Sequence, residues 1–338
     1  MISKLGRRSL RLVTGTSEFF LDQKSQNTVV RLLSEGDLQE AGAILRLAFA
    51  THLGVAPDTF LTDRDFVTGR WLTDPSLGFG AWLGDQLVGS SLAANWGSLG
   101  VLGPISTHPS TWNRGTASYL LRAVLERLDE LGVRHIGLFT FAESTKHVAL
   151  YQKFGFWPRF LTATMTRAVA TNDTIPAGST RYSAIGETVQ AQYLEACRAL
   201  IGELRDGLDL TEEVRCAHRH GHGDTIFLVE GSQIEAVAHC EYGPKSPAGA
   251  GSCLIRFAAV RPASDTDKRF DQLLAACERL ARDEGLVRLV GCVNASRPKA
   301  YRQLLSAGFR TERLGVTMHR PDEDAYKPAA THILEDWR

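Results

Sequence analysis

The sequence predicts an α/β (α+β) fold in which two tandem domains each contain a mixed central sheet flanked by helices. The first observation is the length of 338 residues, which exceeds that of an ordinary single domain. The second is that strand-like and helix-like hydrophobic patterns alternate along the chain. The third is that the pattern of the first half returns in the second half at a constant offset.

The first half begins with a strand, a helix, a hairpin and another strand. We expect these elements, in this order, at residues 29–33, 36–49, 77–83 paired with 87–95, and 99–107. The hairpin is indicated by the turn residues Gly84-Asp85-Gln86 between its two apolar runs.

The rest of the first half alternates helix and strand. Apolar residues in the stretch 116–131 recur with helical spacing on one face, and Gly132 ends this helix. A strand is expected at residues 133–141, followed by a helix at 145–154 that Gly155 ends. Strands joined through a helix tend to lie parallel in one sheet, so at least one parallel pair is expected.

A linker and a second set of elements follow. Residues 169–180 have the composition of a linker. The chain is therefore divided into an N-terminal tail, a first domain, the linker and a second domain, at residues 1–28, 29–168, 169–180 and 181–338. The second domain is expected to begin with a strand, a helix and a hairpin, at residues 180–185, 191–204, and 224–231 paired with 233–242.

An internal repeat connects the two halves. Positions 153 apart match through a strand and two helices, as in the pairs Pro109 and Pro262, Gly132 and Gly285, Gly155 and Gly308, and Phe156 and Phe309. The offset holds without a gap, so we interpret the halves as two copies of one fold.

The composition excludes two classes of partner. Lysine plus arginine and aspartate plus glutamate number 38 each, so no net basic field would hold nucleic acid. No apolar run approaches the roughly 20 residues of a membrane span.

All six cysteines lie in the second half without a CxxC pair, which is typical of a reduced, cytoplasmic protein. Residues 1–17 are basic, which leaves open a transit peptide, a disordered tail or an upstream alternative start.

The stretch STWNRGTASYLL at residues 110–121 places small and polar residues where a strand gives way to a helix. A helix N-terminus leaves about four backbone N–H groups without helical partners and attracts phosphate. Gly115 and Ala117 keep this corner open, and Asn113 and Arg114 add side-chain donors. The pattern therefore indicates either a phosphate site or a simple helix cap with a tight turn. Neither a P-loop motif nor a GxGxxG motif after a strand is present.

Two motifs resemble those of the GNAT superfamily of acetyl-CoA-dependent N-acetyltransferases. The phosphate-loop pattern Q/R-x-x-G-x-G/A appears as Trp112-Asn113-Arg114-Gly115-Thr116-Ala117. The pattern N-x-x-A-x-x-L-Y-x-K-x-G-F appears as the run from Ser144 to Phe156, STKHVALYQKFGF. The departures are Trp112, Ser144 and His147. The resemblance covers residues 29–168 well and residues 180–320 more weakly.

The resemblance implies acetyl-CoA as co-substrate, without a metal. Its pyrophosphate would rest on the backbone N–H groups of residues 113–118, and its pantetheine arm would pair with the strand at residues 105–107. A free N–H of that strand would face the thioester oxygen. The implied cofactor-binding residues are Ile105, Ser106, Thr107, Trp112, Asn113, Arg114, Gly115, Thr116, Ala117, Ser118 and Ser144.

The same resemblance implies Tyr151 as the acid that protonates the departing CoA sulfur; a Tyr packed on an amphipathic helix is the alternative. Glu143 follows a strand and is the candidate general base, although a solvated surface Glu is an equal alternative. His147 lies one helical turn before Tyr151 and is a candidate proton relay. Ordered water is a further alternative for the base.

The second copy lacks the small loop residues and the tyrosine of the first copy. At the positions that match Gly115, Thr116 and Ala117 it has Lys268, Arg269 and Phe270, and at that of Tyr151 it has Leu304. We therefore expect one working site, in the first copy. We interpret the second copy as a degenerate repeat, retained for structure or for shaping the acceptor site of the first. The cluster Cys216-Ala217-His218-Arg219-His220-Gly221-His222 resembles a zinc patch, but no second ligand pair has the usual spacing, so no metal is expected. The closing segment 325–338 is expected to dock on the body.

The leading functional hypothesis is an acyltransferase that transfers acetyl from acetyl-CoA to the amine of a small molecule or peptide. The first alternative is a tandem acyl- or aminoacyl-transferase that uses another donor. The second is a module that binds CoA as a sensor or structural ligand, without turnover.

Overall fold

The computed structural model describes residues 28–170, 178–328 and 331–338. The predicted N-terminal tail up to residue 27 and residues 171–177 of the predicted linker lie outside this range.

The first half confirms the predicted order of strands and helices. Its strands are β1 (Thr28–Leu32), β2 (Gly78–Leu83), β3 (Gln86–Trp96), β4 (Leu99–Thr107), β5 (His135–Thr140) and β6 (Trp157–Ala168). Its helices are α1 (Leu38–Leu53), α2 (Thr68–Thr73), α3 (Thr116–Glu130) and α4 (Thr145–Gln152). Two further elements of this half, β6 and α2, were not predicted from the sequence. The helix α2 is short, and the amides of Val67 and Thr68 at its start donate to the Asp65 carboxylate.

The second half repeats this order. Its strands are β7 (Ser179–Arg181), β8 (Gly223–Glu230), β9 (Gln233–Glu241), β10 (Ser252–Val260), β11 (Arg288–Asn294), β12 (Arg310–Arg320) and β13 (Ile333–Glu335). Its helices are α5 (Glu187–Leu204), α6 (Thr211–His220), α7 (Thr266–Asp283) and α8 (Pro298–Ser306). The bounds of β10 lie 153 positions after those of β4, so the structure keeps the offset found in the sequence.

One predicted strand is wrong in part. Residues 180–185 were expected to be extended, but β7 ends at Arg181 and a 3₁₀ turn covers Tyr182–Ala184. The turn forms because the amide and hydroxyl of Ser183 both donate to the carboxylate of Asp224, at 3.1 and 2.5 Å. A side-chain acceptor thus binds the backbone amide and favours a turn at a place where the sequence pattern predicts a strand.

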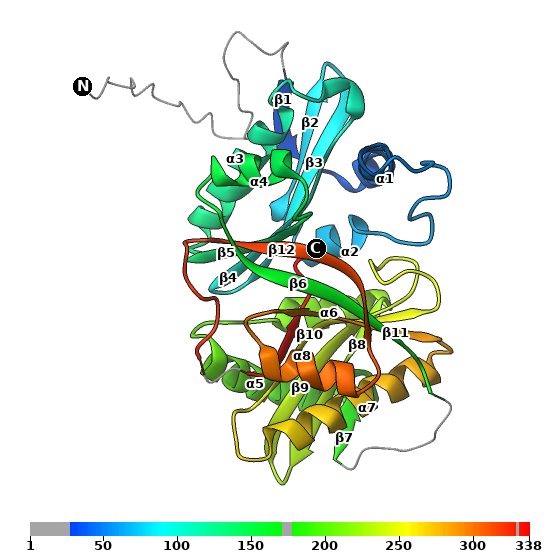
Figure 1. Cartoon of the computed structure of the whole chain (residues 1–338), viewed down its shortest axis with the longest axis vertical. Coiled ribbons are helices and arrows are strands. Elements are labelled where there is room, and N and C mark those ends of the chain that lie inside the picture. The colour runs from blue at the N-terminus through cyan, green and yellow to red at the C-terminus, as the bar shows by residue number, and fades with distance from the viewer. Residues whose placement is uncertain (1–27, 171–177, 329–330) are drawn as a thin grey trace, which may run out of the picture.

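The described strands form one mixed sheet that runs through both halves, with β13 joined to β10 at its side. The strand order is β1-β2-β3-β4-β5-β12-β6-β11-β10-β9-β8-β7. Each half therefore gives its last long strand to the other: β12 pairs with β5, and β6 pairs with β11. Figure 1 shows β6 and β12 crossing the middle of the molecule, between the helices of the first half and those of the second.

The core follows the predicted helix face. Leu120, Leu121, Val124 and Leu128 of α3 are fully buried and pack in one apolar cluster with residues of β2, β3, β4 and β5. All six cysteines are buried and free, with no disulfide among the described residues. In the part of the chain that the structure describes, no helix combines the length and the apolar character needed to span a bilayer.

The end of the chain crosses from the second half to the first. The amide of Asp336 donates to the carbonyl of Arg256 in β10, and the carbonyl of Trp337 accepts from the amide of Phe139 in β5. The Trp337 ring is 2% exposed and lies against Gly137 of β5, where an added Cβ would be 2.2 Å from the ring. Only a residue without a side chain fits between β5 and this ring.

This contact generates a prediction about stability. Replacing Gly137 by Ala should lower the free energy of unfolding by about 1–3 kcal/mol, because the methyl group overpacks the Trp337 ring. The measurement is denaturant unfolding of the full chain. As a control, Gly202→Ala in α5, where no atom lies within 4 Å of the added Cβ, should raise stability by about 0.5–1 kcal/mol. Equal stability of Gly137→Ala and the parent would contradict the packing.

Candidate active site

The candidate site begins where β4 and β5 diverge. The two strands pair in parallel only at Leu99, Gly100 and Val101. Beyond Val101, β4 follows β3 instead, and an irregularity in the pairing of β4 with β3 falls between Leu102 and Ile105. Residues 102–107 of β4 therefore have no strand partner on the side of β5 among the described residues. This leaves backbone groups that are available to a ligand.

A cavity of about 620 Å³ extends from this opening. Its walls come from α1, the loop at residues 60–66, β4, the loop before α3, the end of β5 and α4. The predicted residues that line it are Ile105, Ser106, Thr107, Trp112, Asn113, Gly115, Thr116, Ala117, Ser118, His147 and Tyr151. The structure thus brings the two sequence motifs to one cavity.

The loop before α3 has the geometry of an anion site. Asn113 and Gly115 both have positive φ, of 65° and 88°, which turns successive backbone amides toward one side. The amides of Asn113, Gly115, Thr116 and Ala117 have no hydrogen-bond partner among the described residues. The indole N–H of Trp112 donates to the carbonyl of Thr107 at 2.9 Å and fixes the loop against β4.

Two lysines that the sequence analysis did not select lie on the same cavity. Lys146 and Lys153 of the α4 region line it, and the ammonium of Lys146 lies 5.4 Å from the centre of the Trp112 ring. The signal was present in the sequence, because both residues stand within the second motif. Their positive charge adds to that of the α3 N-terminus.

Tyr151 is deeply buried but borders the cavity. It is 7% exposed, and its ring meets that of Phe156 edge to face at 6.2 Å. Burial raises the pKa of the phenol well above its usual value. The hydroxyl therefore keeps its proton through neutral and moderately alkaline pH.

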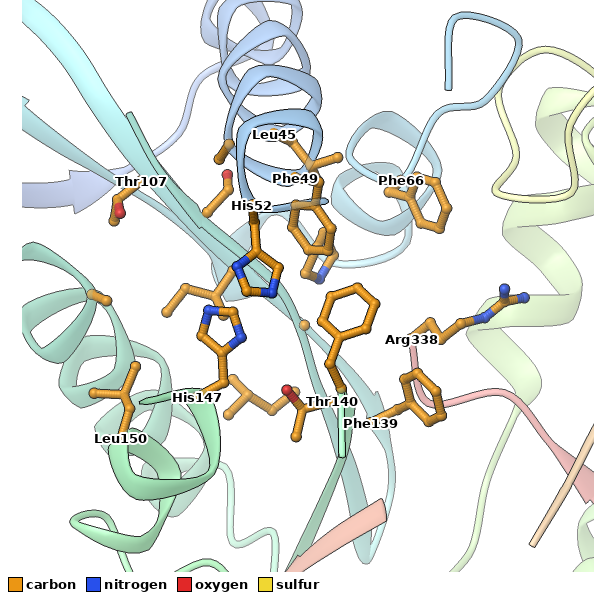
Figure 2. A pocket seen from close by; sticks show the side chains of 18 of the residues that line it. Leu45, Phe49, His52, Phe66, Thr107, Phe139, Thr140, His147, Leu150 and Arg338 are labelled. Atoms are coloured by element: carbon orange, nitrogen blue, oxygen red, sulfur yellow. The ribbon is translucent and has the colours of Figure 1, made fainter. Parts of the chain in front are cut away.

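Two histidines from different helices lie side by side at the wall of the cavity. His52 at the end of α1 and His147 of α4 have ring centroids 4.8 Å apart, and the Phe141 ring lies beside both. Figure 2 shows the two imidazoles pointing toward one another from the two helices. Burial lowers the pKa of His147, and the nearby His52 and Lys146 lower it further. His52 was not predicted as a site residue, because its helix α1 lies far from α4 in the chain and outside both motifs.

Three predicted site residues lie outside the cavity walls. Glu143 and Arg114 are exposed, and Ser144 is buried in the turn before α4, where its amide donates to the carbonyl of Phe141. None of the three is among the residues that line the cavity. Their predicted roles remain predictions, and the geometry adds no support for Glu143 as a base.

The equivalent opening in the second half is filled by the chain itself. β10 pairs with β11 only from Ser252 to Ile255 and then diverges, as β4 does from β5. The strand β13 occupies this gap and pairs with β10 at Phe257, Ala258 and Ala259. Two of these residues, Ala258 and Ala259, lie 153 positions after Ile105 and Ser106. Those two residues of the first half are expected to pair with pantetheine.

Side chains close the rest of the second opening. Phe270 and Leu304, at the positions of Ala117 and Tyr151, are fully buried, and the His332 ring lies 5.2 Å from that of Phe270. Arg269 is engaged in ion pairs with Glu230, Glu235 and Asp265. This cation is therefore already neutralised by carboxylates of the second half.

The second half also contributes to the cavity of the first. Among its lining residues are Leu254, Arg288, Val290, Glu312, Arg313, Trp337 and Arg338. Figure 2 shows Arg338 on the side of the cavity away from α4. None of these residues was predicted from the sequence, because they come from segments far from the two motifs and only the fold brings them to this cavity.

A buried ionic cluster lies between the halves. Glu213, His239 and Glu241 bring three ligand atoms within 4.8 Å of one another, and they form the one such group found among the described residues. The indole of Trp96 donates to Glu213 at 2.8 Å, and Arg256 lies 4.0 Å from Glu241. Burial raises the pKa of Glu241 to about 7 despite that cation. Because arginine already compensates these carboxylates, we assign no metal here. The residues of the suspected zinc patch, Cys216 to His222, do not converge in this way.

Comparisons with known proteins identify a family match and similar folds. Residues 43–156 match the model of the family described as Acetyltransferase (GNAT) family. A structure described as an acetyltransferase from Pyrococcus horikoshii is similar with a TM-score of 0.66 at 13% identity, over 95% of this chain and 99% of that one.

Two further solved structures have the same fold. A GCN5-related N-acetyltransferase from Sphaerobacter thermophilus has a TM-score of 0.54 at 16% identity, over 86% of this chain and 95% of that one. A tandem GNAT protein from the clavulanic acid biosynthesis pathway has a TM-score of 0.53 at 12% identity, over 87% and 98%. These similarities confirm the predicted tandem GNAT fold. No curated protein matches the sequence significantly.

The histidine pair generates a prediction about protonation. NMR titration of the imidazoles in the full chain should give His147 a pKa below 6.5, because burial and the neighbouring His52 disfavour its charged form. Replacing His52 by Gln should raise this pKa only part of the way, because burial, the larger cause, remains. A pKa of His147 at or above 6.5 in the parent chain would contradict the arrangement.

Proposed function

Because residues 43–156 match the model of the GNAT acetyltransferase family, we propose that the chain transfers acetyl from acetyl-CoA to an amine, at a single active site in the first half. The observation that supports one site is the contrast between the two openings. That of the first half leads into a cavity lined by Tyr151 and the α3 loop. That of the second half is occupied by β13.

The free backbone groups of the first opening fit acetyl-CoA. The four open amides at residues 113–117 would hold the pyrophosphate, with Lys146 and Lys153 adding charge. The unpaired stretch of β4, including Ile105, Ser106 and Thr107, would pair with the amides of the pantetheine arm. Pairing of this kind holds an extended ligand as if it were an added strand.

The transfer requires two proton movements. The neutral amine attacks the thioester carbonyl, a C–N bond forms, and the C–S bond then breaks. Tyr151 is the proposed proton donor to the departing sulfur, since its raised pKa keeps the hydroxyl protonated. The proton lost by the amine has a nearby acceptor in the imidazole of His147, whose lowered pKa keeps it neutral at pH 7. A backbone N–H of β4 would stabilise the oxyanion.

The first and second domains, at residues 29–168 and 181–338, then differ in role. We propose that the first binds the co-substrate and that the second serves as a scaffold which also supplies part of the acceptor wall. The acceptor is an amine on a small molecule or peptide. A cytoplasmic location remains a prediction that rests on the reduced cysteines.

The proposal predicts the stoichiometry and location of coenzyme binding. Calorimetry should show one acetyl-CoA per chain, and Gly115→Glu should abolish binding, because the carboxylate repels phosphate and occupies the loop. Gly132→Glu is a matched control at the other end of α3, since Gly132 also has positive φ and no atoms lie within 4 Å of an added Cβ. Undiminished binding in Gly115→Glu, or two molecules per chain, would refute the single site.

The proposal also predicts the role of Tyr151. Tyr151→Phe should lower kcat by about tenfold to a hundredfold while the dissociation constant of acetyl-CoA stays within about threefold, since only the proton donor is lost. The measurement is thiol release with a broad panel of amines. Tyr301→Phe, on the corresponding helix α8, is the control and should retain full activity. Tight binding of coenzyme without any turnover in the parent chain would instead favour a sensor.

A further inference from the structure

The far end of the cavity, away from the α3 loop, is lined by charged residues from both halves. Arg64 comes from the loop after α1, Arg288 from the start of β11, and Arg338 from the end of the chain. Glu312 and Arg313 of β12 complete this end. The co-substrate would occupy the opposite end, so these residues face the acceptor.

Arg64 has an unused hydrogen-bonding group. Its guanidinium donates no hydrogen bond to the described residues, and the nearest carboxylate oxygen, of Asp63, lies 3.9 Å from its Nε. The side chain is only 23% exposed. Its loop is held in place because Asp63 accepts from the amide of Ala250 at 2.8 Å. A positioned guanidinium with free N–H groups is suited to bind an oxyanion in a bidentate manner.

The neighbouring arginines are only partly satisfied. Arg338 gives its Nε and Nη2 to Asp336, at 2.8 and 2.7 Å. Arg288 donates through Nε to Ser252 at 3.1 Å, while its Nη1 stays 3.6 Å from Glu312. Burial lowers the pKa of Arg64 and Asp63 opposes this, but the positive charges of Arg338 and Arg288 lower it further. The three cations therefore act on one another.

The charges at this end do not balance. The positive groups are Arg64, Arg288, Arg313 and Arg338, and the negative groups beside them are Asp63, Glu312 and Asp336. Arg70, whose Nη2 donates to the carbonyl of Arg338 at 3.0 Å, adds a further cation, so cationic side chains outnumber anionic ones here. An acceptor with an anionic group would offset this excess, and the planar fork of a guanidinium matches the two oxygens of a carboxylate.

We propose, as an extension that rests on the proposed function, that the acceptor is an amine with a carboxylate, which Arg64 binds with Arg288 beside it. The amine then points toward the histidine pair and Tyr151. Phe66 and Phe139 line the cavity between these two ends, and Figure 2 shows both on the Arg338 side of the histidine pair. An apolar spacer between carboxylate and amine fits this passage.

The test compares matched ligands by calorimetry on the full chain, with and without saturating CoA. The panel contains aliphatic amines of several lengths, each as the ω-amino carboxylate, the primary amide and the phosphonate. The carboxylates should bind about tenfold or more tightly than the amides. Arg64→Gln and, separately, Arg288→Gln should reduce that preference to under about threefold, with acetyl-CoA affinity unchanged. Arg215→Gln, on the exposed face of α6, is the control and should keep the full preference.

Each outcome decides the proposal. Equal binding of carboxylates and amides, no binding of either, or an unchanged preference in both arginine variants overturns it. A stronger preference for phosphonates overturns the assignment of a carboxylate. The proposed function fails by a separate readout, which is the absence of coenzyme binding or of thiol release in the parent chain.

Discussion

Backbone N–H and C=O groups lose their strand partners where two parallel strands diverge. The character of the two openings in this structure depends on how those groups are satisfied. β4 leaves β5 after Val101, and β10 leaves β11 after Ile255. Backbone N–H and C=O groups exposed in such a gap require partners. In the second half β13 supplies them, and in the first half the gap opens into the cavity. One duplicated geometry therefore yields an opening that β13 fills and an opening in which Arg70 binds only the carbonyls of Val101 and Gly103, while residues 105–107 of β4 border the cavity.

The exchange of β6 and β12 makes the two halves a single physical unit. Each half completes its sheet with a strand of the other, so neither has its full sheet alone. The exchange also brings Glu312 and Arg313 of β12 to the cavity of the first half. The closing segment adds to this, because it pairs first with β10 and then reaches Phe139 of β5. Residues of the second half therefore form part of the wall of the cavity in the first half.

Local sequence motifs predicted several of the residues that border the cavity in the structure. Asn113 and Gly115 adopt positive φ, as small or polar residues at a tight corner permit, and Tyr151 faces the same cavity. Those residues lie within continuous motifs, so their relation is fixed by one loop and one helix. The candidate base is different. Glu143 follows a strand as expected, yet the turn before α4 leaves it on the surface, while His52 enters the cavity from a distant helix.

The sequence by itself determined the tandem repeat, the order of most strands and helices, and the loop that ends at α3, because each follows from short-range periodicity and turn chemistry. The tertiary structure alone decided the exchange of the last strands, the filling of the second opening by β13, and the meeting of Arg64, Arg288 and Arg338. These depend on pairing between segments far apart in the chain. No local pattern encodes such pairing, since a strand presents the same hydrogen-bonding edge to any partner.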